Sequence, residues 1–222
     1  IKEFGTPMPD HVFDSIKKVN TALDNQIPLL GFAGAPFTLA TYMVEGKTSK
    51  QFIEIKKFLY QYPDTAKKLL TLLSDTIAKY LRAQINAGVH AIQLFDSWGG
   101  ILAADEFEQY SLPYIQNIFS SLKDIDIPKI LYVNNSHHLL SLQKDSGATV
   151  ISLDWRSPIH EAIKILGDNI SIQGNLDPSI LYADKYYIKM KTLQILTAVK
   201  DRNGFIFNLG HGVLKTTPVE NV

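Results

Sequence analysis

The amino-acid sequence predicts an α/β protein in which helices cover a parallel β-sheet. Three observations support this prediction. Short apolar runs recur along the chain, the segments between them have helical spacing, and every apolar run ends in small or polar residues. Strand and helix signals that alternate in this way are typical of parallel sheets, because parallel neighbours need a long connection that is usually a helix.

Six apolar runs have the length of strands and are bounded by turn-forming residues. They lie far enough apart for a helix to fit between successive strands. In chain order they are residues 28–33, 91–95, 129–133, 149–153, 171–173 and 205–209.

Four of the intervening segments place apolar residues three and four positions apart, as one face of a helix does. The longest comprises residues 64–87. Residues 105–122 follow the same spacing, and Pro113 predicts a break or kink inside them because proline cannot donate a helical hydrogen bond. The remaining two helices are expected over residues 158–166 and 185–199.

Each predicted strand is followed by small and polar residues. Parallel strands bring such exits to one end of a barrel or of an open sheet, where α/β enzymes have their sites. Aspartate, serine and asparagine also serve as helix N-caps, which explains single residues equally well. Trp98, Trp155 and His211 are not capping residues, so the set as a whole indicates a site.

The composition bounds the classes of function. The chain has 22 basic and 22 acidic residues, and its net charge of zero gives no general attraction to nucleic acid or to a membrane. It has no cysteine, which removes disulfides, thiolate metal sites and cysteine nucleophiles and fits a cytoplasmic protein. No apolar run is long enough to cross a membrane. With 222 residues and no low-complexity linker, we expect one domain over residues 1–222.

A closed barrel would need more strands than the six that the sequence predicts. The chain also begins at Ile1 without a methionine and ends at Val222, shortly after a Thr217-Pro218 pair that reads as the start of a helix. We therefore expect a fragment that is truncated at both ends and lacks at least two barrel strands on the N-terminal side.

Five segments resemble, in order, the signature segments of uroporphyrinogen decarboxylase. They are GFAGAPFTLATYMVEG (31–46), AIQLFDSWGG (91–100), ISLDW (151–155), IQGNLDP (172–178) and FNLGHGVLKTTPVENV (207–222). The resemblance implies a (β/α)8 TIM barrel, incomplete here with about six strands, that is usually a homodimer. It implies a carboxy-lyase that removes CO2 from the four acetate side chains of uroporphyrinogen III to give coproporphyrinogen III for haem synthesis, with no metal and no organic cofactor.

The resemblance implies that three residues bind the substrate carboxylates: Tyr42, Ser97 and His211. From residue type alone, Tyr42 could equally pack in the core with its hydroxyl bonded to backbone. A hydroxyl such as that of Ser97 can donate to a carboxylate at little steric cost. His211 differs from the other histidines because glycines flank it and allow backbone to approach a ligand closely.

Further residues of the same segments are expected to support the cleft. Phe32 and Phe37 would form an apolar wall, and Asp154 and Asn175 would hold the loops in shape. We interpret Asp96 as structural, because an acid beside a polyanionic substrate would repel it.

The resemblance assigns the catalytic aspartate and an arginine-rich loop to the N-terminal part that we expect to be missing, so the catalytic residue of this chain stays unknown. Decarboxylation of a pyrrole acetate needs a protonated ring, and arginines would hold the substrate acids. Of the three arginines, Arg82 and Arg202 lie in helical segments, which leaves Arg156 as the arginine expected at the cleft. We therefore expect the isolated 222-residue chain to be inactive.

Two alternatives stay open. The first is a corrinoid-dependent methyltransferase of the same superfamily, which would need zinc held by histidine and cysteine ligands. The second is a catalytically silent, truncated scaffold, since an incomplete barrel leaves two sheet edges exposed.

Overall fold

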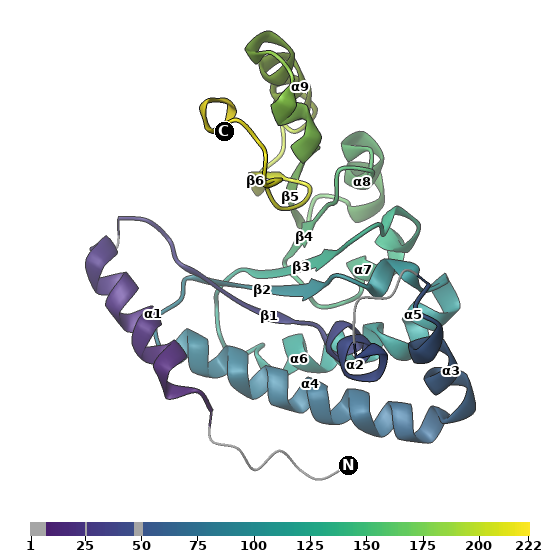
Figure 1. Cartoon of the computed structure of the whole chain (residues 1–222). Helices are drawn as coiled ribbons and strands as arrows, with labels where there is room; N and C mark the ends of the chain where they lie inside the picture. The colour runs from purple at the N-terminus through teal and green to yellow at the C-terminus, as the bar shows by residue number, and fades with distance from the viewer. Residues whose placement is uncertain (1–7, 25, 47–50) are drawn as a thin grey trace.

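The computed structural model describes residues 8–24, 26–46 and 51–222, so residues 1–7, 25 and 47–50 of the expected 1–222 domain lie outside the described residues. Six strands form one parallel sheet in the order of the sequence (Figure 1), which confirms the predicted sheet. They are β1 (Leu30–Gly34), β2 (Ala91–Asp96), β3 (Lys129–Val133), β4 (Val150–Ser152), β5 (Ser171–Leu176) and β6 (Phe205–Leu209). Because all neighbours are parallel, the carboxyl ends of the strands lie along one edge.

Apart from the first helix, which precedes β1, the helices connect successive strands. They are α1 (Asp10–Leu23), α2 (Pro36–Glu45), α3 (Ile53–Gln61), α4 (Pro63–Asn86), α5 (Ala104–Tyr110), α6 (Leu112–Ser121), α7 (Leu140–Lys144), α8 (Ile159–Leu166) and α9 (Lys185–Ala198), with short 3-10 turns η1 (Gly99–Ile101), η2 (His137–Leu139), η3 (Pro178–Tyr182) and η4 (Val219–Asn221). The predicted break at Pro113 is confirmed, since α5 ends before it and α6 begins beside it. Four helices, α1, α2, α3 and α7, lie outside the four segments with predicted helical spacing.

The main hydrophobic core lies between the sheet and the helices on its outer face. In Figure 1, α4 and α6 lie next to each other on the same side of β1–β3. Leu70 and Leu81 of α4 and Ile92 and Leu94 of β2 are almost completely buried in this core. The helical spacing of α4 therefore corresponds to a face that packs on the strands and fixes the outer side of the sheet.

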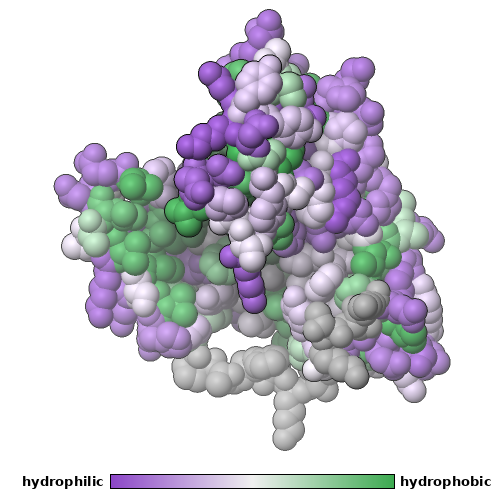
Figure 2. Space-filling model, turned by 45° about the horizontal axis from the view of Figure 1, so that its top comes forward, coloured by the Kyte–Doolittle hydropathy of each residue, from purple (hydrophilic) through white to green (hydrophobic). Residues whose placement is uncertain are grey.

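The inner face of the sheet is open at both of its edge strands. Leu30 and Phe32 on the inner face of β1 are 44% and 63% exposed, and Ile206 of β6 is 42% exposed. Figure 2 shows this side as a hollow between the surface near α1 and β1, where hydrophobic residues gather, and the surface near β6 and α9. Within the described residues, the six strands do not close into a ring.

A side-chain amide occupies the free edge of β1. Gln84 of α4 accepts a hydrogen bond from the N–H of Phe32 at 3.0 Å and donates to the carbonyl of Phe32 at 2.9 Å. The N–H and carbonyl of Phe32 are the two backbone groups that a further strand would bond. The Gln84 amide therefore gives both groups a hydrogen-bond partner at this edge.

Strand β2 ends at a buried carboxylate that joins three elements. Asp96 is fully buried, and its two oxygens accept from the hydroxyls of Thr38 on α2 and Ser111 between α5 and α6, each at 2.6 Å. The Thr38 hydroxyl also accepts from the N–H of Trp98 at 3.1 Å. Burial raises the pKa of Asp96, and the hydrogen bonds act in the opposite direction. Asp96 therefore holds helices against the end of β2, which agrees with the structural role expected from the sequence.

The chain after β6 passes very close to the chain after β4. Gly210 is held first by β5, because its N–H donates to the carbonyl of Leu176, the last residue of that strand, at 2.7 Å. A Cβ atom at Gly210 would lie 2.2 Å from the backbone nitrogen of Trp155, whereas a Cβ atom at Gly212 would meet nothing within 4 Å. A residue without a side chain is therefore needed at position 210 and not at position 212.

We expect Thr38→Val to destabilise the protein more than Thr38→Ser. Valine preserves the volume but removes the hydroxyl, which leaves the Asp96 carboxylate and the Trp98 N–H without this partner. A buried polar group without its partner costs about 1–3 kcal/mol, whereas serine keeps the hydroxyl. Urea unfolding gives the free energy of each variant, and a Thr38→Val protein as stable as wild type would contradict the role assigned to Asp96.

We expect Gly210→Ala to reduce the free energy of unfolding by about 1–3 kcal/mol, because the added methyl group overpacks the contact with Trp155. Gly212→Ala is the matched control, since it adds the same methyl group in open space. Calorimetric Tm values compare the two variants. Equal Tm values would show that the two exits do not pack as closely as described.

Candidate active site

A cavity of about 370 Å³ opens at the carboxyl ends of the strands. It brings together Ser97 and His211, two of the three substrate-binding residues expected from the sequence, although they are far apart in the chain. The lining residues are Gln93, Phe95, Ser97, Tyr132, Ser152, Asn208, Leu209, His211 and Gly212. A depression of about 530 Å³ along α9 is larger, but all of its lining residues come from one helix face.

The alternation of β2 decides which of its residues reach the cavity. Successive side chains of a strand point to opposite faces. Gln93, Phe95 and Ser97 therefore share the inner face and line the cavity, while Leu94 and Asp96 are buried against the helices. The position of Ser97 thus follows from the outward position of Asp96.

Three aromatic rings form a wall on the inner face of β1, β2 and β3. The rings of Phe32 and Phe95 are nearly perpendicular with centroids 5.9 Å apart, and those of Phe95 and Tyr132 are 5.8 Å apart. Edge-to-face pairs at these distances are favourable for aromatic groups. This wall could contact the flat faces of an aromatic ligand.

Part of the cavity wall is polar, and Gln93 and Ser152 belong to it. The Gln173 side chain donates to the Gln93 side chain at 3.2 Å and to the hydroxyl of Ser152 at 3.0 Å. All three residues are buried. Their hydrogen bonds to one another satisfy polar groups that burial would otherwise make costly.

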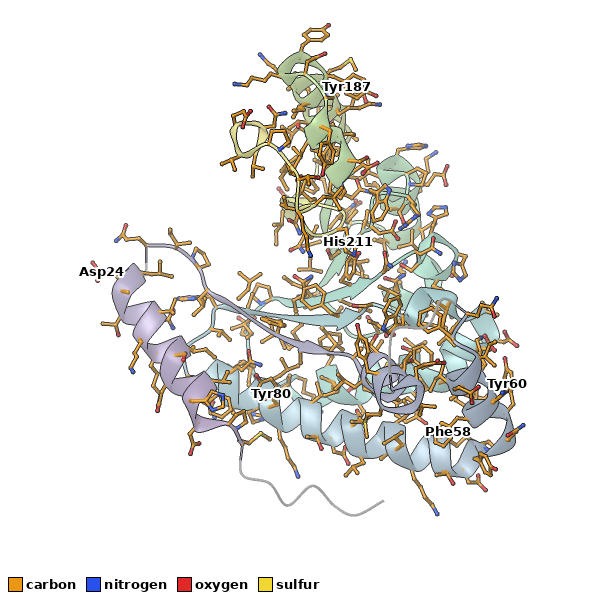
Figure 3. The ribbon with its side chains drawn as sticks, viewed as in Figure 1. Asp24, Phe58, Tyr60, Tyr80, Tyr187 and His211 are labelled. Carbon is orange, nitrogen blue, oxygen red and sulfur yellow. The ribbon has the colours of Figure 1, made fainter. Side chains whose placement is uncertain are left out.

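Contacts from two other strand exits fix the position of His211. The Tyr132 hydroxyl donates to the carbonyl of the preceding residue, Gly210, at 3.1 Å. Burial raises the pKa of Tyr132, as does the nearby Asp154 carboxylate, so the hydroxyl stays protonated and can donate. The His211 ring stands perpendicular to that of Trp155 with centroids 5.9 Å apart. In Figure 3, His211 lies in the chain that follows β6, between β6 and the strands β1–β3.

Asp154 and Asn175 are buried and connect loops. The two carboxylate oxygens of Asp154 accept from the backbone N–H groups of Ser136 at 3.1 Å and Arg156 at 2.7 Å. The Asn175 amide donates to the carbonyls of Asp154 at 2.9 Å and Ser157 at 2.7 Å. In this structure both side chains bond backbone groups of neighbouring loops.

Tyr42 lies on α2, outside the residues that line the cavity. Helix α2 begins at Pro36, whose missing N–H is not needed in a first helical turn. Six residues later, Tyr42 is 49% exposed, and its ring packs against that of Trp98 with centroids 6.0 Å apart. Because Trp98 follows Ser97 directly, Tyr42 is next to the rim of the cavity and is not a core residue.

The structure corrects the position of Phe37. This side chain was expected in the cleft wall together with Phe32, but it is fully buried in the core between α2 and its neighbours. Position 37 lies in the first turn of α2 and faces inward, whereas Phe32 lies on the exposed inner face of β1. Phe95 and Tyr132 occupy the place in the wall that we expected Phe37 to take.

Several lining residues were missed in the sequence: Gln93, Phe95, Tyr132, Ser152 and Asn208. The period of two in β2 indicates Gln93 and Phe95 once Ser97 is placed on the inner face. Tyr132 and Ser152 have no local signal, since β3 and β4 are buried throughout.

The described residues lack two kinds of feature. No group of three or more histidine, cysteine, aspartate or glutamate side chains in that part of the chain is arranged to hold a metal ion. No helix in the same residues has the length and apolar character needed to cross a membrane.

Comparison with known proteins agrees with the geometry. Residues 3–222 match the model of the family described as Uroporphyrinogen decarboxylase (URO-D). A uroporphyrinogen decarboxylase from Syntrophotalea carbinolica is 44% identical over 210 residues, which are 95% of this chain and 61% of the relative. Another from Carboxydothermus hydrogenoformans is 43% identical over 97% of this chain and 62% of its own length. The chain thus spans about three-fifths of the length of these curated relatives.

A solved structure of a methyltransferase from Methanosarcina mazei superposes with a TM-score of 0.81 at 20% identity, over 95% of this chain and 60% of that one. At this identity the likeness concerns the fold alone. It agrees with the open six-stranded sheet as an incomplete (β/α)8 barrel, which is the predicted fold.

The two kinds of similarity therefore differ in what they establish. Structural likeness identifies the architecture, while the family match extends over almost the whole sequence and includes the segments that form the cavity. On that ground, the chain belongs to the uroporphyrinogen decarboxylase family.

Proposed function

We propose that the protein decarboxylates uroporphyrinogen, removing CO2 from its acetate side chains to give coproporphyrinogen. The observation that carries the proposal is the identity of 41–44% to relatives named uroporphyrinogen decarboxylase over 95% or more of the chain. The cavity supports it, because polar groups surround an aromatic wall, as a ring system with acidic substituents requires.

The chemistry defines what the site has to provide. Protonation of the ring carbon next to the one that bears the acetate gives an iminium cation, and this cation is conjugated to the acetate-bearing carbon and acts as an electron sink. The bond to the carboxylate then breaks, its electron pair enters the ring and CO2 leaves. A proton adds to the remaining methylene to give a methyl group, and the ring carbon loses the proton it had gained, which restores the aromatic pyrrole. A site that binds the substrate acids and favours the cationic ring lowers the barrier to this step.

We assign the residues of the cavity to binding and orientation in this reaction. The Ser97 hydroxyl and the His211 imidazole would donate hydrogen bonds to substrate carboxylates. Tyr42 would reach over the rim next to Trp98 and donate from its phenol group. Phe32 and Phe95 would contact a pyrrole face, and this contact would exclude water from the reacting bond.

A methyl-transfer function has weaker support. The structural neighbour named as a methyltransferase is 20% identical, so its likeness concerns the fold and does not extend to the site. The decarboxylase proposal includes the cytoplasmic location and the homodimer that the family resemblance implies. It also includes a small-molecule substrate as the partner of the cavity.

We expect the full-length protein to convert uroporphyrinogen stepwise to porphyrinogens with fewer carboxylates, while residues 1–222 alone are expected to be inactive. The assay is anaerobic incubation in the dark, followed by oxidation and chromatography of the porphyrins. Heat-denatured protein is the control for uncatalysed loss of CO2. Folded protein that binds uroporphyrin but releases no decarboxylated product would contradict the proposal.

In the full-length protein, we expect Tyr42→Phe to lower kcat/KM while leaving the Tm close to that of wild type. The change removes a hydroxyl and keeps the ring that packs on Trp98. Loss of a hydrogen bond to a charged group costs roughly 1.5–3 kcal/mol, on the order of 10- to 150-fold in kcat/KM.

Tyr62→Phe is the matched control, because Tyr62 is also exposed and lies between α3 and α4, away from the cavity. Unchanged kcat/KM in Tyr42→Phe would remove Tyr42 from the set of binding residues. A lowered Tm with normal kcat/KM would show a packing role instead.

A further inference from the structure

We propose that Arg156 binds a carboxylate of the ligand beside His211 and that the Trp155 ring holds its guanidinium at the rim of the cavity. The inference rests on the proposed function in one respect only, the acidic character of the ligand. It deepens that function by naming a cationic group of this chain that would recognise a polycarboxylate.

The first argument is the position of the guanidinium group. Arg156 follows β4, and its guanidinium carbon lies 3.6 Å from the centroid of the Trp155 ring. A cation over an aromatic face at this distance is favourable, most of all for tryptophan. The same Trp155 ring is perpendicular to the ring of His211, with centroids 5.9 Å apart. Trp155 therefore contacts both the cation and the histidine of the cavity.

The second argument is a chain of polar contacts from Arg156 to the cavity wall. Nη1 of Arg156 lies 3.5 Å from Oδ1 of Asn134, and the Tyr132 hydroxyl lies 3.4 Å from the same oxygen. Tyr132 lines the cavity. The guanidinium thus lies at the strand exits, beside the loops that follow β3 and β6.

The third argument is that the guanidinium retains free donors. A guanidinium carries five N–H donors, and its one hydrogen bond within the described residues is the long contact with Asn134. Nη1 also forms an ion pair with Oδ1 of Asp154 at 3.7 Å, which is too long for a hydrogen bond, and the Asp154 oxygens already accept from two backbone N–H groups. The Arg156 side chain is 44% exposed, so a ligand can reach these donors.

The other two arginines are occupied by structural contacts. Arg82 makes a two-pronged bond to Asp124 at 2.9 and 2.8 Å, which joins α4 to the chain after α6. Arg202 donates to the carbonyls of Gly167 and Ile170 near the start of β5. Of the chain's three arginines, Arg156 alone is therefore available to a ligand at the cavity.

These contacts predict how Arg156 recognises its ligand. A planar guanidinium can bind both oxygens of one carboxylate, while a lysine ammonium acts as a point charge. The stacking on Trp155 holds the plane in place before the ligand arrives, so less side-chain entropy is lost on binding. Arg156 should thus contribute to affinity for porphyrins that carry many carboxylates.

The test is the binding of uroporphyrin, the oxidised and unreactive form of the proposed substrate, measured by quenching of tryptophan fluorescence. We expect Arg156→Gln to raise the Kd by about 10- to 100-fold, as for loss of a charged hydrogen bond. Arg156→Lys keeps the charge without the fork and should give an intermediate Kd. Lys164→Gln removes the same charge from an exposed residue of α8 outside the cavity and should leave the Kd unchanged.

The outcomes separate this inference from the proposed function. If the wild-type protein binds uroporphyrin through Arg156 but does not decarboxylate uroporphyrinogen, the role of Arg156 stands and the proposed reaction is wrong. Normal turnover with the same Kd and KM in wild type and Arg156→Gln would overturn the role of Arg156 and leave the reaction intact. Tm values check that each variant is folded, and if Arg156→Gln does not fold, an Arg156→Lys protein with wild-type Kd overturns the inference.

Discussion

The buried carboxylate of Asp96 is the constraint on which the rest of the site depends. It lies at the last position of β2, and its hydrogen bonds to Thr38 and Ser111 fix α2 and the α5–α6 junction against the strand. Since side chains alternate along a strand, an outward Asp96 requires inward Phe95 and Ser97. The same contact also sets the direction of α2, which carries Tyr42 toward Trp98.

The opposite wall of the cavity depends on contacts between exits that are distant in sequence. Tyr132 near the end of β3 and Trp155 after β4 both lie against Gly210 after β6. Gly210 allows the backbone to pass next to Trp155, and the Tyr132 hydroxyl bonds the carbonyl that precedes His211. The histidine is thus positioned by contacts that residues from other strand exits make with Gly210 and with its own ring.

The charges of the site show why net charge is a poor guide to its ligand. The chain is neutral as a whole. At the cavity, however, the acids Asp96 and Asp154 are buried and bonded within the protein, whereas the guanidinium of Arg156 is partly exposed. The solvent-facing rim therefore presents donors and a positive charge, which suits an acidic ligand even though acidic residues are close by in the sequence.

By itself, the sequence determined the periodic elements, because their patterns are local. The strands at 129–133 and 205–209, the long helix α4 and the break beside Pro113 all follow from spacing and residue type. Its family segments also indicated Ser97 and His211, which share one cavity in the structure.

Only the tertiary structure decided which side of each element faces the cavity. Phe37 and Phe95 have the same side chain, yet one is in the core and the other lines the site. Strands buried on both faces carry no polar alternation to distinguish inside from outside, so Tyr132 and Ser152 could not be recognised. The stacking of Arg156 on Trp155 and the close passage at Gly210 arise from contacts between distant strand exits, and no local pattern records such contacts.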